Sequence, residues 1–575
     1  WSGRVSADWV HFTQGGSEPT ACAMLNVPLG QSIAVRASGT FQHKPGLIDI
    51  DTPGRAPQKD ADDSYNRTGR VMALWQASDR LAVNLWYAQG DRKSDELPLV
   101  TNAQGDFTRN DAPAPSPVDN RYALSTLDLH YAFDWATLVS VTGYQTKYSL
   151  TDTDTSYLVH PLAELGLHNI HARREVHTRG VLQELRLVSP DQGPWNWLLG
   201  GFYSTYTADV SAGLYLYPGL TAVDNLLSLL PPGTVPLFDP QNGFATVTNG
   251  FHPVYAYERA LFGEITRTLF DDWSLTLGGR WYATGVQGTP AANTKANTPL
   301  KQADNGFSPK LSVSYRPSDN LMVYTTVSRG FQYGGFNVAI GLPVPLTFKS
   351  ATLWNYETGL RTDWLDRTLR FDITALYLRL TNPQVYVPSN DQISAYVDNV
   401  GGARSVGAEA TLRYLTPLPG LSIEIAASHI KSTTTKEYTD ADGTEVPVGS
   451  AMPSAPVVQT ATTLAYAHAF GSWQAQTALI HSYQGSAWND IEHDVQVGGY
   501  SLLHASLGVS RSDLPLSPSL TFSVNNLLNA HKMTSALGGA DTIAADPQLS
   551  EALTSPRLRV FTVPRTYRVN LQVQF

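Results

Sequence analysis

The last nine residues of the chain, from Tyr567 to Phe575, alternate apolar and polar side chains without exception. Side chains of a strand point to opposite faces with a period of two, so the five apolar residues share one face and the four polar residues share the other. In a soluble sandwich the apolar face would meet a protein core. In an outer-membrane barrel it would meet lipid, and the polar face would line a wet lumen.

The same division recurs throughout the chain. Period-two segments bounded by turn residues give about 22 candidate strands. Between Leu369 and Tyr377, apolar side chains at every second position alternate with Arg370, Asp372 and Thr374. A charged side chain on a lipid-facing surface costs about 2–4 kcal/mol near the membrane midplane, so repeated segregation of this kind favours the lipid interpretation.

The connections between candidate strands alternate in length. Short ones, such as Phe133-Asp134 and Phe470-Gly471, alternate with long ones, such as residues 212–252 and 533–562. Short periplasmic turns and long extracellular loops are typical of outer-membrane barrels, and both chain ends fall on the short-turn side. Tryptophans close to the short turns predict an aromatic girdle at the headgroup level; they are Trp135, Trp195, Trp197, Trp273, Trp364 and Trp473.

Composition and motifs exclude several other classes. No run of 18 or more apolar residues predicts a transmembrane helix. The net charge of −10, without a basic stripe, argues against nucleic acid as a partner. Cys22 is the single cysteine, which excludes an intrachain disulfide. Hydrolase, zincin and nucleotide-binding motifs are absent, so we predict no catalytic residue and no cofactor, and we interpret His504 and Ser506 as polar lumen lining.

Two clusters have chemistry that suits a metal ion. His160, His168, His171 and His177 fall in one long connection, but their spacing fits no tight motif, and a solvated polar loop is the preferred interpretation. Asp60, Asp62 and Asp63 have the oxygen ligands that Ca²⁺ prefers, but a surface charge run explains them as well. We therefore predict no metal site.

Several motifs, taken in order, resemble the β-barrel of TonB-dependent outer-membrane receptors. The most specific is the run YTTVSRGFQYGGFN from Tyr324 to Asn337. The others are Ser308-Pro309-Lys310, Asn355 to Arg361 (NYETGLR), Gly407 to Ala410 (GAEA), Asn525 to Asn529 (NNLLN) and the ending from Pro564 to Phe575. The resemblance covers nearly the whole chain and implies an all-β fold: a 22-stranded antiparallel transmembrane β-barrel in the outer membrane of a Gram-negative bacterium.

The resemblance also implies partners. Members of this family carry an N-terminal plug domain that is moved by the inner-membrane TonB complex, and their terminal aromatic strand is read by the barrel assembly machinery. We expect residues 1–575 to form one barrel domain in contact with outer-membrane lipid, with the plug and the signal peptide outside this sequence. The plug was removed or left out, is supplied by another chain, or is absent in a plugless porin. Tyr567 and Phe575 are the candidate assembly signal.

The resemblance implies uptake of a scarce small molecule or metal chelate, by default an iron–siderophore complex. A passive large-pore porin and a surface-binding barrel without active transport stay open as alternatives. Sites combine apolar walls with a few oriented polar groups, so aromatic and amide residues of the long loops are the candidate ligand contacts. They are Tyr333, Phe336, Asn337, Tyr386, Trp488 and Asn489, for which loop packing is the competing explanation.

Overall fold

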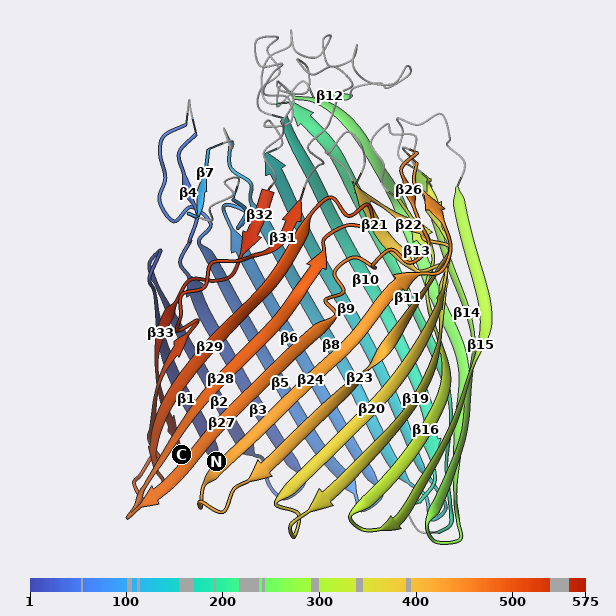
Figure 1. Cartoon of the computed structure of the whole chain (residues 1–575), viewed down its shortest axis with the longest axis vertical. Coiled ribbons are helices and arrows are strands. Elements are labelled where there is room, and N and C mark those ends of the chain that lie inside the picture. The colour runs from blue at the N-terminus through green and yellow to red at the C-terminus, as the bar shows by residue number, and fades with distance from the viewer. Residues whose placement is uncertain are drawn as a thin grey trace.

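The chain forms a tall, closed β-barrel (Figure 1). The computed structural model describes all residues except 53–54, 101–105, 111–113, 155–169, 191–192, 217–236, 240–243, 291–298, 338–344, 389–394, 442 and 538–557. The described residues contain no helix long and apolar enough to cross a membrane. The main sheet has 23 strands, of which β12 pairs with one end of β13 alone, so 22 antiparallel strands form the closed ring. The predicted fold and strand number are therefore confirmed.

Strands of the ring follow one another in chain order, and each pairs with its sequence neighbours in the ring. They are β1 (Ser2–Phe12), β2 (Ser17–Pro28), β3 (Ile33–Lys44), β5 (Ser64–Ser78), β6 (Leu81–Ser94), β8 (Val118–Ala132), β9 (Thr137–Asp154), β10 (Ile170–Val188), β11 (Trp195–Leu216), β13 (Phe244–Leu269), β14 (Trp273–Pro290), β15 (Leu300–Ser318), β16 (Leu321–Gln332), β19 (Ala351–Trp364), β20 (Leu369–Thr381), β23 (Gly402–Leu415), β24 (Leu421–Thr434), β27 (Val458–Phe470), β28 (Trp473–Trp488), β29 (Gln496–Arg511), β30 (Ser519–Asn525) and β33 (Thr566–Gln574).

The remaining strands are short and belong to the long connections. They are β4 (Asp49–Ile50), β7 (Thr108–Arg109), β12 (Leu237–Asp239), β17 (Gly335–Phe336), β18 (Thr347–Phe348), β21 (Gln384–Pro388), β22 (Ala395–Asn399), β25 (Tyr438–Thr439), β26 (Glu445–Val446), β31 (Met533–Leu537) and β32 (Leu558–Phe561). Apart from β12, they pair with one another: β4 with β7, β17 with β18, β21 with β22, β25 with β26, and β31 with β32.

The last strand closes the ring against the first. β33 pairs with β1 from Arg4 to Phe12, and the backbone groups of Gly3 and Phe575 exchange two hydrogen bonds of 2.6 and 3.0 Å. A Cβ at Gly3 would lie 2.4 Å from the tip of the Phe575 ring, so a larger residue here would displace that ring. On the lumen face, Asp8 accepts hydrogen bonds from Arg568 and Asn570. The alternation read from residues 567–575 therefore closes the barrel.

The outward face is apolar over most of its height. Leu199, Leu261 and Leu571 are 60%, 63% and 52% exposed, although leucine is usually buried in a soluble protein. Along each strand, outward apolar residues such as these alternate with polar residues that face the lumen. This is the pattern of a barrel whose outer surface contacts lipid. Five of the six flagged tryptophans are exposed beside short turns, and Trp135 stacks on the sixth, Trp197, with ring centroids 6.2 Å apart.

Tight turns join the strands at one end, and long connections gather at the other (Figure 1). In the three-residue turn between β13 and β14, Phe270 and Asp271 adopt the positive φ values of 51° and 59° that let a tight hairpin follow the right-handed twist of its strands. The N- and C-termini both lie near the short-turn end in Figure 1, as the sequence predicts.

Apolar clusters hold the described parts of the long connections together, and two of them have seven buried residues each. The first loop core joins the β3–β5 and β6–β8 connections and consists of Phe12, Leu47, Ile48, Ile50, Ala61, Val100 and Phe107. The second loop core joins the β20–β23, β24–β27 and β28–β29 connections and consists of Val385, Val387, Tyr396, Val400, Tyr438, Val446 and Ile491. Burial against one another gives these loops a defined arrangement, because each apolar side chain removed from water stabilises the packed state.

Candidate functional site

The barrel wall changes its pairing beside a lumen-side pocket. β15 pairs with β16 from Lys310 to Ser318, and beyond Lys310 the described part of β15 keeps its partner β14 but pairs no further with β16. Pro309, which has no N–H to donate, stands where the pairing stops. Beyond that point Phe331 stacks on Tyr282 of β14, with ring centroids 3.4 Å apart and planes 8° apart. The end of β16, which stays paired with β19 as far as Gln332, therefore covers the lumen side of β14.

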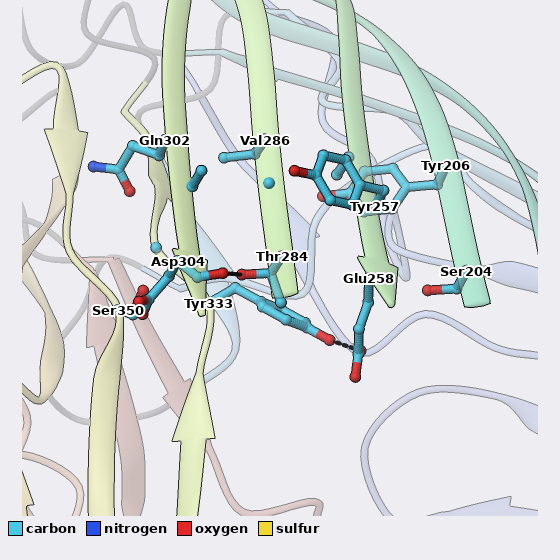
Figure 2. A pocket seen from close by; sticks show the side chains of 14 residues that line it. Ser204, Tyr206, Tyr257, Glu258, Thr284, Val286, Gln302, Asp304, Tyr333 and Ser350 are labelled. Atoms are coloured by element: carbon cyan, nitrogen blue, oxygen red, sulfur yellow. Dashed lines mark hydrogen bonds between the residues drawn. The ribbon is translucent and has the colours of Figure 1, made fainter. Parts of the chain in front are cut away.

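The pocket lies between this covering segment and the inner faces of β11, β13, β14 and β15. Figure 2 shows Tyr333 reaching across to Glu258 on β13, with Thr284 and Asp304 on the neighbouring strands. Its cavity volume of about 70 Å³ is smaller than the roughly 300–1,000 Å³ of sites that enclose a whole small molecule, so it can receive only part of a ligand. The lining residues are Ser204, Tyr206, Ala256, Tyr257, Glu258, Thr284, Gly285, Val286, Gln302, Ala303, Asp304, Tyr333, Gly334 and Ser350.

One carboxylate organises the polar side of the pocket. Glu258 is 8% exposed, accepts a hydrogen bond from the Tyr333 hydroxyl and forms an ion pair with Arg280. Arg280 in turn lies over the rings of Phe202 and Phe262, with its Cζ 5.1 and 5.6 Å from their centroids. A buried carboxylate is stable only when its charge is compensated in this way. The pocket can therefore offer phenol and carboxylate oxygens beside an apolar wall.

The three predicted contacts from the β16–β19 connection have different surroundings. Tyr333 is 46% exposed and lines the pocket. Phe336 is half-buried in the small β17–β18 pair. Asn337 is buried, donates to the carbonyls of Pro345 and Val397 at 2.8 Å and accepts from the Val397 N–H at 2.8 Å. Asn337 thus joins its own loop to β22.

The other three predicted contacts lie on the second loop core or next to it. Tyr386 lies between Val385 and Val387 of that core, and its own side chain is 73% exposed. Trp488 stacks on His493 with ring centroids 4.7 Å apart. Asn489 donates to the Ala536 carbonyl at 2.9 Å and accepts from the Ala536 N–H at 3.2 Å, so it joins its loop to β31.

Polar contacts tie the loops of the second core to the pocket. Gln384 Nε2 donates to the Tyr333 carbonyl at 2.6 Å, which connects β21 with the loop that covers the pocket. The Tyr438 hydroxyl donates to Asp398 Oδ2 at 2.9 Å, which connects β25 with β22. Burial and the nearby carboxylates, Asp440 first among them, raise the pKa of Glu492 to about 8. The six predicted contacts thus fall in connections that these contacts join, and of the six only Tyr333 lines the pocket.

The two predicted clusters form no metal centre in the described part of the chain. His160 and His168 lie outside the described residues. His171 is buried and pairs with Asp152 at 2.8 Å, whereas the exposed His177 pairs with Glu175 at 3.1 Å. Among the described residues no three His, Cys, Asp or Glu side chains are close enough to hold a metal ion.

The acidic run Asp60, Asp62 and Asp63 makes hydrogen bonds within its loop. The interpretation as a surface charge run is wrong for Asp62, which is buried. Asp62 is 5% exposed and accepts hydrogen bonds from the N–H groups of Leu47 and Ile48 at 2.5 and 2.7 Å. Asp60 donates through its N–H to Asp49 Oδ1, and Asp63 contacts His43 at 3.3 Å. His504, which the sequence predicts as polar lumen lining, lies on β29, and its Nδ1 is 3.3 Å from Asn525 Oδ1 of β30.

Sequence reasoning missed most of the pocket. Glu258, Asp304 and Arg280 were not candidates, because a charged residue at a lumen-facing position of a strand is common in a wet barrel. The available signal was weak: Asp304 lies in the loop-side half of β15, whereas Glu258 and Arg280 lie nearer the short turn that joins β13 and β14. The contact between Glu258 and Tyr333 spans 75 positions in the sequence, so no local pattern reports it.

Comparison with known proteins identifies the family. The family model described as TonB dependent receptor-like, beta-barrel matches residues 53–527. The pesticin receptor of Yersinia pestis is 26% identical over 210 residues, which are 36% of this chain and 29% of that protein. The match therefore spans less than a third of the length of this curated relative.

Solved structures share the fold over the whole chain. The ferric yersiniabactin uptake receptor FyuA from Yersinia pestis has a TM-score of 0.77 at 16% identity, covering 100% of this chain and 80% of that one. The unliganded ferric citrate transporter FecA has a TM-score of 0.74 at 14% identity, covering 100% and 78%. With the closed 22-strand ring and the family match, these findings place the protein in the Gram-negative outer membrane. The chain belongs to the TonB-dependent receptor β-barrel family.

Proposed function

We propose that the chain is the barrel of a TonB-dependent transporter that imports a scarce solute, with an iron–siderophore complex as the first candidate. In this proposal the extracellular loops bind the solute and a plug domain outside residues 1–575 closes the lumen. The TonB complex of the inner membrane then moves the plug to release the solute inward.

The observation that carries this proposal is the pocket below the packed loops. Tyr333 and Glu258 present phenol and carboxylate oxygens on the lumen side, and Tyr386 is exposed on the loop assembly above. A solute that first contacts the loops would meet the pocket on its way into the lumen. The names of two structural relatives support a metal chelate as cargo, since they specify ferric yersiniabactin and ferric citrate.

The sequence offers no energy source or catalytic site of its own. It has no nucleotide-binding motif, and no metalloprotease or hydrolase motif is present. Movement of a solute against its gradient therefore requires coupling to another protein, and TonB is the partner that the family membership favours. We propose on the same grounds that the barrel itself catalyses no reaction.

The test is solute binding by cells of a deletion strain that express the full-length protein. Radiolabelled ferric chelates are added at low temperature, where binding is separated from uptake, and the strain without the protein is the control. We expect saturable binding that unlabelled chelate displaces, and low conductance of the purified full-length protein in planar bilayers. Large steady conductance without saturable binding would favour the porin. Binding that never leads to uptake on warming would favour a surface-binding barrel.

A further inference from the structure

Three cations gather on the outward face of β20, β23 and β24. Arg379 and Arg404 are directly opposite each other in the β20–β23 pairing, and Lys431 pairs with Val406, two residues from Arg404. All three side chains are exposed. They share the outward face with Tyr377 and Val406, which are 41% and 47% exposed, because residues two apart on a strand lie on the same face. We call Arg379, Arg404 and Lys431 the cationic patch.

The patch lies at the upper edge of the apolar band. Arg379 is ten residues from Leu369 at the short-turn end of β20, and Lys431 is ten residues from Leu421 at the same end of β24. At about 3.3 Å per residue and a strand tilt of about 40°, ten residues rise about 25 Å. The apolar band of such barrels is also about 25 Å tall. The patch is therefore at the height of the lipid headgroups in the outer leaflet.

The cationic patch has no acidic partner among the residues that the structure describes. The acids on these strands, Asp372, Glu409 and Glu424, occupy the alternate positions that face the lumen, and the ion pair of Asp372 is with Arg370. Elsewhere on the outward face the arrangement differs: Arg121 pairs with Asp119 at 2.5 Å. Like charges directly opposite each other destabilise a strand pair, so the Arg379–Arg404 pair favours an external anion between them.

We propose that the cationic patch binds the phosphate group of a phosphorylated lipid in the outer leaflet. Arginine guanidinium groups match the geometry of phosphate oxygens with paired donors, and two opposed guanidinium groups with a nearby ammonium surround one phosphate. The acyl chains of the same lipid lie along the apolar face below, beside Tyr377 and Val406. The site is thus a lipid-binding site on the outside of the barrel, separate from the solute path in the lumen.

The test uses the purified full-length protein in a neutral detergent with a metal chelator present. Native mass spectrometry measures binding of the phosphorylated glycolipid of the outer membrane, of its dephosphorylated form, and competition by inorganic phosphate. The variant is R379Q/R404Q. The matched control is R370Q/R413Q, because Arg370 and Arg413 form an equally direct pair on the same two strands but on the lumen face.

We expect R379Q/R404Q to bind the phosphorylated glycolipid about tenfold more weakly or worse, since two charge-assisted contacts are lost. R370Q/R413Q keeps the wild-type affinity, and R379K/R404K, which keeps both charges, loses less than R379Q/R404Q. A shift in gel mobility on heating that matches the wild-type shift verifies that each variant is folded. The proposal is overturned by equal binding of the dephosphorylated lipid, by unaltered binding in R379Q/R404Q, or by inorganic phosphate competing as well as the glycolipid.

Discussion

Replacement of Ile491 by alanine tests whether the second loop core holds the extracellular loops together. Ile491 is 1% exposed and belongs to a cluster with Val385 and Val387 of β21, Tyr396 of β22 and Tyr438 of β25. Large-to-small changes of a buried isoleucine cost about 2–5 kcal/mol, because transfer free energy is lost and a cavity is left. A loop site can partly collapse, so we expect about 2–4 kcal/mol for local opening.

This cost has a measurable kinetic consequence. Each 1.4 kcal/mol changes an equilibrium constant tenfold, so amide hydrogen exchange through local opening should accelerate by about 30- to 700-fold. The acceleration should appear in β21, β22 and β25, which contact the core, and in the segment around Ile491 itself. The ring strands β20 and β23 should keep their rates, because their hydrogen bonds do not depend on the loops.

The assay is hydrogen–deuterium exchange with mass spectrometry on the purified protein in detergent. V448A is the matched control, since Val448 lies in the connection after β26 but is 58% exposed. We expect its exchange to match that of the wild type. The reasoning is refuted if I491A accelerates exchange by less than about threefold in β21 and β22, or if the ring strands accelerate equally.

Three further predictions follow from single groups. Deletion of Phe575 removes the residue that closes the seam on Gly3, and we expect less heat-modifiable barrel in the membrane; an unchanged yield would argue against the assembly role. Glu492 keeps its proton to about pH 8 in the packed loop but only to its ordinary pKa near 4.5 when the loop opens, so the packed loop binds more protons. Loop packing is then most stable below pH 4.5 and loses this contribution as the pH rises through 8. The hydrogen exchange of the segment around residue 492 should lack this pH dependence in E492Q. The same dependence of exchange on pH in E492Q and wild type would contradict the prediction. Y333A removes the side chain that covers Glu258, and chelate affinity should fall about tenfold while S204A at the same pocket stays within about twofold; equal affinities would remove Tyr333 from the site.

The fold was predictable because a lipid boundary imposes a strict alternation on every spanning strand. Each segment such as Leu369–Tyr377 reports its two faces locally, and the ending from Tyr567 to Phe575 does so without exception. The long and short connections could be assigned to opposite ends for the same reason. Each strand can be predicted from its own alternation, because that alternation does not depend on the neighbouring strands.

The site was less predictable because it depends on contacts between distant loops. Val387 and Ile491 share one core although 104 positions separate them, and no periodic pattern marks either residue. Asn337 and Asn489 resemble ligand contacts in sequence, but their amides join loops to β22 and β31. The sequence could propose aromatic and amide loop residues as candidates, whereas burial and partner geometry decide which of them are available to a ligand.

Energised uptake is the most direct test of the central claim. A deletion strain expressing the full-length protein is given radiolabelled ferric chelates at growth temperature, with and without a protonophore that collapses the inner-membrane gradient. The account predicts saturable uptake of at least one chelate that the protonophore abolishes and that a strain without TonB does not show. Uptake that is unsaturable and unaffected by the protonophore would contradict active transport and identify a passive pore.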